Sequence, residues 1–139
     1  MSIIQTQTTS FKAQLYQGVH DLTTDVIKIA LYTASANLNE DTTAYNATDE
    51  VANTGTYVAG WAQLTPITVS SSGYTAFVGF PNISWTGVIT ARGALIYNST
   101  ASGAACAVLS FGGDQQVSSG DFTIQFPTAA AATAIIRIA

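Results

Sequence analysis

The sequence is poor in charged residues. Only 9% of its 139 residues are Asp, Glu, Lys or Arg, whereas about 25% is usual in a globular domain. Apolar residues nonetheless make up 47% and aromatic residues 10%, which suffices for a packed core and excludes a disordered chain. Soluble monomers carry many surface charges and interface cores carry few, so this shortage predicts a chain that associates with itself or with a larger assembly.

Basic residues, cysteine and histidine are also scarce. The chain has four Lys and Arg against eight Asp and Glu, which gives a net charge of −4, and it has no run of basic residues. This composition excludes a nucleic-acid-binding surface and a basic helix at a membrane surface. The single cysteine, Cys106, cannot form an internal disulfide. The chain has one cysteine and one histidine, His20, which are too few ligands for a zinc site. We therefore expect no metal and no cofactor.

Long hydrophobic segments are missing as well. The first ten residues, MSIIQTQTTS, have neither the charged start nor the apolar stretch of a signal peptide. The longest run of small and apolar residues, PTAAAATAIIRIA, is too short to span a bilayer. We therefore expect a protein that is made in a cytoplasm and has no membrane partner.

No catalytic motif is present. The sequence has no Gly-x-Ser-x-Gly elbow and no phosphate-binding glycine loop. His20 lies beside Asp21 on the polar side of a predicted helix, where a surface or subunit-contact role is expected. Four acidic residues lie in a polar loop without the spacing of a calcium site, namely Glu40, Asp41, Asp49 and Glu50. We therefore expect no enzymatic activity.

One helix is predicted near the N-terminus. Residues 10–22 place four apolar side chains at helical spacing, and Ser10 could cap the first turn. Residues 1–9 precede this helix as an arm that could dock onto a neighbour. Residues 34–56 form a long polar loop, of a length that is usually functional or reaches a partner.

The rest of the chain reads as short strands. Apolar residues recur with a period of two, and Gly, Pro, Asn and Ser separate the segments. The expected strands are 26–33, 57–65, 67–71, 74–80, 88–98, 104–111, 121–126 and 133–139. The pattern predicts one mostly-β domain over residues 1–139. Its fold is expected to be an antiparallel β-sandwich or jelly-roll-like barrel of about seven to eight strands with one N-terminal helix.

Three of the four basic residues fall within predicted strands, at Lys28, Arg92 and Arg137. Alternation along residues 88–98 places Arg92 away from the core and toward solvent or a partner. The face opposite Arg92 is predicted to be core, with Ile89, Ala91, Gly93, Leu95 and Tyr97. Gly93 itself suggests a bulge or the close approach of another backbone.

Two tryptophans, Trp61 and Trp85, could stack on sugars. A tryptophan in a β-sandwich more commonly belongs to the core or to an interface. Both interpretations stay open from the sequence.

The chain resembles small structural proteins of tailed bacteriophages. The resemblance rests on FKAQLYQGVHDLTTDVIKIALYTASANLNEDTTAYNATDEV, GTYVAGW, ITARGALIYNSTAS and VLSFGGDQQVSSGDFTIQFPTAAAATAIIRIA, and covers nearly the whole chain. One departure is that Gly60 is followed by Trp61 and Ala62, where such proteins are expected to have a second glycine and a small residue.

The resemblance implies a virion protein, and first of all a capsid decoration, or cement, protein that bridges and stabilises major capsid subunits. Such proteins are commonly homotrimers, so the implied partners are further copies of the chain and the major capsid protein. Arg92 could then pair with acids of the 40–50 loop or of a capsid subunit. The candidate interface residues are Arg92, Lys28, Arg137, Glu40, Asp41, Asp49 and Glu50.

Two alternatives remain. One is a tail or fibre component with an adhesion role. The other is a carbohydrate-binding module that uses Trp61, Trp85 or Tyr74.

Overall fold

The computed structural model describes residues 2–127 and 129–138. These residues form one helix and nine strands, and the strands make up three antiparallel sheets. The prediction of a mostly-β fold is therefore confirmed. The elements are β1 Thr6–Gln7, α1 Thr9–Tyr16, β2 Ile27–Tyr32, β3 Thr68–Ser72, β4 Thr75–Gly79, β5 Ile83–Thr86, β6 Ile89–Asn98, β7 Ala104–Val117, β8 Asp121–Ile124 and β9 Ile136–Ile138.

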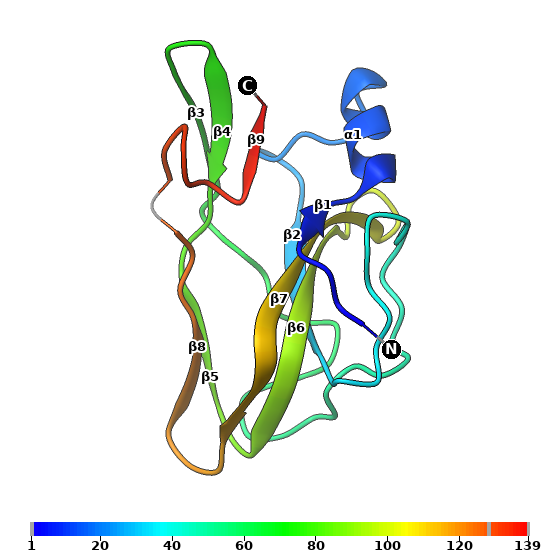
Figure 1. Ribbon diagram of the computed structural model, residues 1–139, viewed down its shortest axis with the longest axis vertical. Helices are drawn as coiled ribbons and strands as arrows, with labels where there is room; N and C mark the ends of the chain where they lie inside the picture. Colours follow the sequence, from blue (N-terminus) through cyan, green and yellow to red (C-terminus); the bar gives the residue numbers. More distant parts are fainter. Residues whose placement is uncertain (1, 128, 139) are drawn as a thin grey trace.

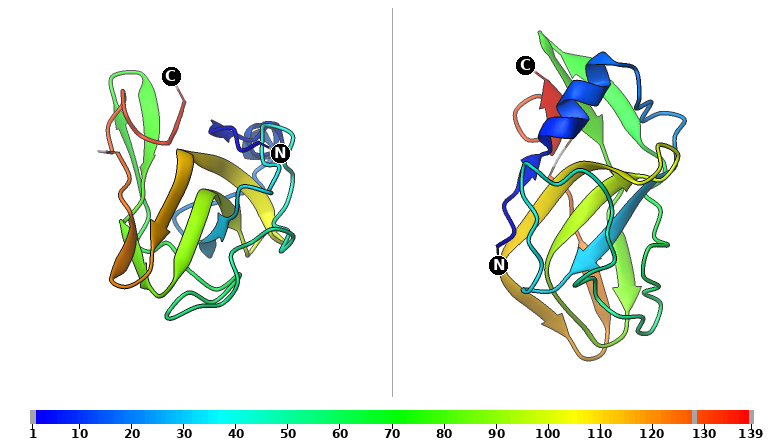
Figure 2. Two further views of the ribbon diagram at one scale, coloured as in Figure 1. Left: turned by 60° about the horizontal axis from the view of Figure 1, so that its bottom comes forward. Right: turned by 90° about the vertical axis from the view of Figure 1, so that its right-hand side faces the viewer.

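The sheets are arranged as a two-layer sandwich (Figure 1). One layer is a four-stranded sheet in the order β1-β7-β6-β2. The other layer consists of a three-stranded sheet, β3-β4-β9, and a two-stranded sheet, β5-β8. These two smaller sheets lie end to end because β4 continues through residues 80–82 into β5 (Figures 1 and 2).

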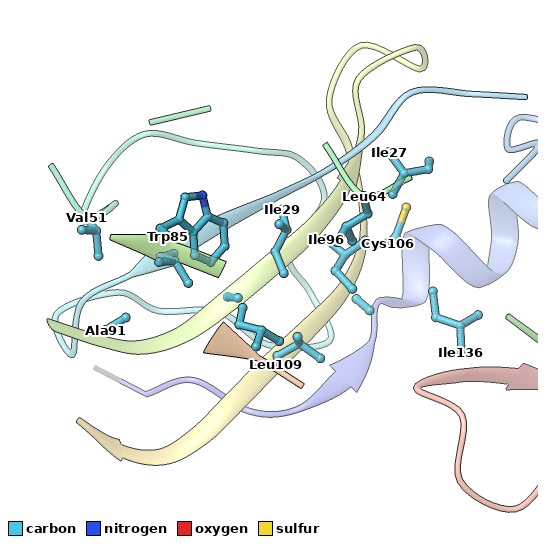
Figure 3. Close-up of a cluster of buried hydrophobic side chains, with 14 of the residues drawn as sticks. Ile27, Ile29, Val51, Leu64, Trp85, Ala91, Ile96, Cys106, Leu109 and Ile136 are labelled. Atoms are coloured by element: carbon cyan, nitrogen blue, oxygen red, sulfur yellow. The ribbon is translucent and has the colours of Figure 1, made fainter. Parts of the chain in front are cut away.

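The main core fills the space between the two layers. Figure 3 shows side chains from β2, β5, β6 and β7 converging there. All of the labelled side chains are at most 8% exposed, so β-branched and aromatic groups from both layers pack without water. The members include Ile29, Leu31, Trp85, Ala94, Ile96, Leu109, Phe122 and Ile136.

A second core covers the outer face of the four-stranded sheet. Tyr32, Leu95, Tyr97 and Val108 are buried there. They are covered by Ile3 of the N-terminal segment and by loop residues that include Ala36, Leu38 and Tyr45. The arm at residues 1–9 therefore packs on its own domain as far as it is described, from residue 2, with β1 paired to β7. The first part of the 34–56 loop covers this outer face, whereas Val51 of the same loop packs in the main core.

The helix is shorter than predicted. It covers Thr9–Tyr16 rather than residues 10–22, and Thr8, not Ser10, caps it by accepting a hydrogen bond from the Phe11 amide at 3.2 Å. Gly18 has φ +70°, a left-handed conformation that ends helices and that glycine adopts easily. The chain leaves the helical path there, and the apolar spacing that continues to Leu22 is not helical.

Three strand assignments also differ from the sequence-based ones. Within residues 57–65, the first half forms a turn, and the rest contacts β2 through a single isolated bridge between Gln63 and Lys28. The Thr65–Pro66 bond is cis. The predicted loop after residue 111 is instead strand, because β7 continues to Val117 alongside β6. β5 was not predicted and is held by pairing with β8. The other predicted strands are present, with ends moved by a few residues.

A bulge overturns the predicted faces of β6. Ala91 pairs with Gln115 but Gly93 pairs with Ser110, so residues 111–114 of β7 lie opposite Arg92. This shift exchanges the two faces of β6 beyond the bulge, because side chains alternate with a period of two. Ala94 and Ile96 consequently join Ile89 and Ala91 in the main core, whereas Leu95 and Tyr97 face the second core.

The predicted close approach at Gly93 is confirmed. A Cβ atom there would lie 2.5 Å from the Leu109 carbonyl oxygen and 2.7 Å from Cγ2 of Ile3. Only glycine leaves room for the N-terminal segment to cross the sheet at this point.

Candidate interaction surface

Three of the predicted contact residues meet at one turn. The turn comprises residues 57–61, and we call it the Trp61 turn. The Gly60 amide donates to Oε2 of Glu50 at 2.8 Å, and the Gly60 carbonyl accepts from Nζ of Lys28 at 3.5 Å. Trp61 follows directly, and 74% of its surface is exposed. An acid from the long loop, a base from β2 and an exposed indole are therefore brought together.

Glu50 is the centre of this arrangement. Its carboxylate accepts hydrogen bonds from the hydroxyls of Tyr45 and Tyr57 and from the Gly60 amide. The Tyr57 hydroxyl in turn accepts from the Leu31 amide of β2 at 2.9 Å. One half-buried carboxylate thus ties the long loop and the Trp61 turn to the sheet, with charge-assisted bonds that are stronger than neutral ones.

The tyrosines around Glu50 are held in their protonated form. Burial, together with the negative charge of Glu50, raises the pKa of Tyr57, Tyr45 and Tyr32, and raises the pKa of Tyr97 to about 12. At neutral pH each hydroxyl therefore remains a donor. That state is the one in which Tyr45 and Tyr57 can donate to the carboxylate.

The turn requires glycine at position 60. Gly60 has φ +75°, which is unfavourable for other residues, and a Cβ atom would lie 2.9 Å from the Tyr45 hydroxyl oxygen. The Trp61 amide donates to the Val58 carbonyl at 3.2 Å and closes the turn. The exposed indole is thus presented on a backbone that is already ordered, which lowers the entropy cost of using it in a contact.

The two predicted tryptophans have different locations. Trp85 is 5% exposed and lies in the main core (Figure 3). It packs edge-on against Tyr57 at a ring distance of 5.4 Å. It is therefore not available for a surface contact. Trp61 is exposed, and so is Tyr74 at the tip of the β3–β4 hairpin.

Within one chain, Arg92 pairs with Asp114 rather than with the 40–50 loop. Its Nη1 lies 3.7 Å from Oδ1 of Asp114, which belongs to the bulge in β7, and both side chains are about half exposed. The bulge carries this acid to the position opposite Arg92. The predicted pairing of Arg92 with acids of the 40–50 loop or of a capsid subunit concerns an interface between chains and stays a prediction. An exposed ion pair of this kind contributes little stability.

The remaining predicted residues are spread over the surface. Arg137 is exposed on β9 and donates to the Ala131 carbonyl at 2.8 Å. Glu40, Asp41 and Asp49 are exposed in the long loop. In residues 2–127 and 129–138, no group of three or more His, Cys, Asp or Glu side chains is placed to hold a metal ion.

The sequence-based analysis missed an apolar groove. It is an open groove of about 510 Å³ between α1 and the β3-β4-β9 sheet, with Leu15 on one wall and Val69, Ala76 and Ile138 on the other. Figure 1 shows α1 standing apart from this sheet at the same end of the molecule. Residues 74–80 were predicted as a strand, but no sequence signal indicated that part of the sheet facing α1 stays uncovered.

No helix within the described residues has the length and apolar character needed to cross a membrane. Comparisons with protein-family models, with curated proteins and with solved structures gave no match.

Proposed function

We propose that this chain is a structural protein of a bacteriophage virion, with capsid decoration as the first choice. In this role it attaches to major capsid subunits, bridges them and stabilises the head. The resemblance of the sequence to small phage structural proteins is the reason for proposing a virion protein. The shortage of charge, 9% of residues, fits a protein whose surface is largely covered by neighbours.

The observation that carries the proposal is the Trp61 turn. Tryptophan is enriched among the few residues that dominate binding energy at protein interfaces. Here the indole is 74% exposed, and its backbone is fixed from both sides by Glu50 and Lys28. A large apolar group held rigidly in water is suited to insertion into a pocket on a partner protein.

The test is binding of purified chain to heads of the parent phage that lack it, measured by co-sedimentation. Trp61→Ala is expected to weaken binding about 30-fold, which corresponds to about 2 kcal/mol for a central tryptophan. Tyr74→Ala is the matched control, because it removes another exposed aromatic ring from a distant turn. Equal binding by Trp61→Ala and the unchanged chain would refute the role of Trp61.

Cryo-electron microscopy of the parent particle tests the location. Density for this chain between major capsid subunits is the expected result, and its symmetry gives the copy number, with a trimer expected. Density on the tail alone would replace decoration by a tail or fibre role. A particle without the chain would remove the virion proposal altogether.

Carbohydrate binding is the second candidate, either in a fibre or in a separate binding module. The exposed Trp61 favours it, because an indole face can stack on a sugar ring. Trp85 is buried and cannot extend the platform, so a single ring would carry the stacking. Quenching of indole fluorescence by a glycan, lost in Trp61→Ala, would support this candidate.

A further inference from the structure

His20 is the only histidine in the sequence, and it joins three parts of the fold. It lies in the connection between α1 and β2, beyond the true end of the helix. Nε2 lies 2.8 Å from Oε1 of Gln14 on α1, and Nδ1 lies 2.9 Å from Nδ2 of Asn98 at the end of β6. The imidazole also packs against the Phe11 ring, with 5.0 Å between the ring centroids. The side chain is therefore half-buried rather than free on the surface.

The amide of Asn98 has only one favourable orientation. Its Nδ2 also donates to Oδ2 of Asp25 at 2.8 Å, and its Oδ1 accepts from the Ala101 amide at 3.1 Å. A turned amide would aim its oxygen at the Asp25 carboxylate and its NH₂ group at another donor. Asn98 is 0% exposed, so water cannot relieve such a mismatch.

This orientation determines the protonation of His20. Because Asn98 presents an N–H group, Nδ1 of His20 must be the acceptor, and the proton must sit on Nε2, where it is donated to Gln14. A second proton on Nδ1 would face the N–H of Asn98, and the hydrogen bond would become a contact between two donors.

The surrounding charges do not compensate for this conflict. Burial lowers the pKa of His20, and the attraction of Asp25 opposes this shift without cancelling it. Asp21 is exposed and accepts from Thr23 instead. Other titratable groups nearby are Lys12, exposed on α1, Arg137 on the opposite wall of the groove, and Cys106, whose pKa burial raises to about 12.

We propose that His20, Asn98 and Asp25 form a pH-sensitive latch that holds the α1–β2 connection on the sheet while His20 is neutral. Protonation breaks the bond between His20 and Asn98, and residues 17–25 detach. The last turn of α1, which carries Gln14 and Leu15, loses its tie to β6. Because Leu15 and His20 both line the groove beside β9, the latch sets the position of one groove wall.

The first test is nuclear magnetic resonance of the imidazole nitrogens in the full chain. At pH 7.5 the expected state is neutral, with the proton on Nε2. A proton on Nδ1 of the neutral ring would overturn the proposal, since Nδ1 could then not accept from Asn98.

The second test is amide hydrogen exchange at pH 7.5 and pH 5, corrected for the intrinsic effect of pH. If the open state has the ordinary histidine pKa, opening of residues 17–25 rises by up to about 30-fold at pH 5. Amides of the paired strands β6 and β7 are expected to show no comparable change. Equal protection of residues 17–25 at both pH values would overturn the latch.

Two variants provide the controls. His20→Asn keeps an oxygen that can accept from Asn98 but does not titrate, so the acceleration at pH 5 should disappear. Asp25→Asn keeps an acceptor for Asn98 and removes the attraction that favours a protonated imidazole in the closed state, so the acceleration at pH 5 should be at least as large as in the unchanged chain. Persistence of the acceleration in His20→Asn, or its loss in Asp25→Asn, would overturn the proposal.

Discussion

Removing the Glu50 carboxylate should destabilise the protein far more than its loop position suggests. Glu50→Ala removes the acceptor for the hydroxyls of Tyr57 and Tyr45 and for the Gly60 amide. Tyr57 is 1% exposed, and leaving its hydroxyl without this acceptor costs about 2 kcal/mol. Tyr45 and Gly60 are partly exposed and can turn to water, so each loss costs about 1 kcal/mol.

The expected loss for Glu50→Ala is therefore about 4 kcal/mol in the free energy of unfolding. Glu50→Gln keeps one acceptor oxygen and loses the charge, so about half of that loss is expected. Urea denaturation followed by circular dichroism measures both values, with an unchanged dependence on urea concentration if the unfolding stays two-state.

Asp49→Asn is the matched control for this experiment. Asp49 is the adjacent acid, its side chain is exposed, and asparagine tolerates its φ of +63°. A change within about 0.5 kcal/mol is expected. If Glu50→Ala were as stable as Asp49→Asn, the idea that this carboxylate fastens the long loop would be wrong.

Three further changes test the fold. Gly93→Ala should cost about 3 kcal/mol because its Cβ would meet the Leu109 carbonyl at 2.5 Å, while Gly113→Ala, with no atom within 4 Å, should be neutral in the same denaturation assay. Trp85→Ala should cost about 4 kcal/mol through the cavity it leaves, and a loss under 1 kcal/mol would contradict its place in the core. Burial raises the pKa of Tyr97 to about 12, so the folded state keeps a proton that the unfolded state releases near pH 10. The contribution of Tyr97 to the free energy of unfolding should consequently be fully present below pH 10 and be lost above it. A midpoint of thermal unfolding that is the same at pH 9 and pH 11 would contradict this.

Local sequence patterns predicted most of the strands and the fold class. Alternation of side chains identifies β2, β6 and β8, because one face of each must be buried. Gly93 was recognisable as a point of close backbone approach, since a strand interior has little other use for glycine. The shortage of charge was equally visible, and it supports the proposal of a covered surface.

Other features depended on pairing between distant segments. β5 has no strong pattern and exists because β8 pairs with it. The helix ended early because the chain turns at Gly18, where the conformation and not the apolar spacing is decisive. The predicted faces of β6 failed beyond Ala91 because the bulge is formed with β7, and no pattern within β6 records it.

For the candidate interaction surface too, some features could be predicted from the sequence and others only from the tertiary structure. Composition singled out Lys28, Glu50, Trp61 and Trp85 as residues with a possible contact role, because charges and tryptophans are rare in this chain. Only the tertiary structure decided that Trp85 fills the core while Trp61 is left exposed, since each depends on which segments cover it. The hydrogen bonds that join Glu50 to two tyrosines and to Gly60 arise when the long loop folds over the sheet, a placement that residue types and their local spacing do not encode.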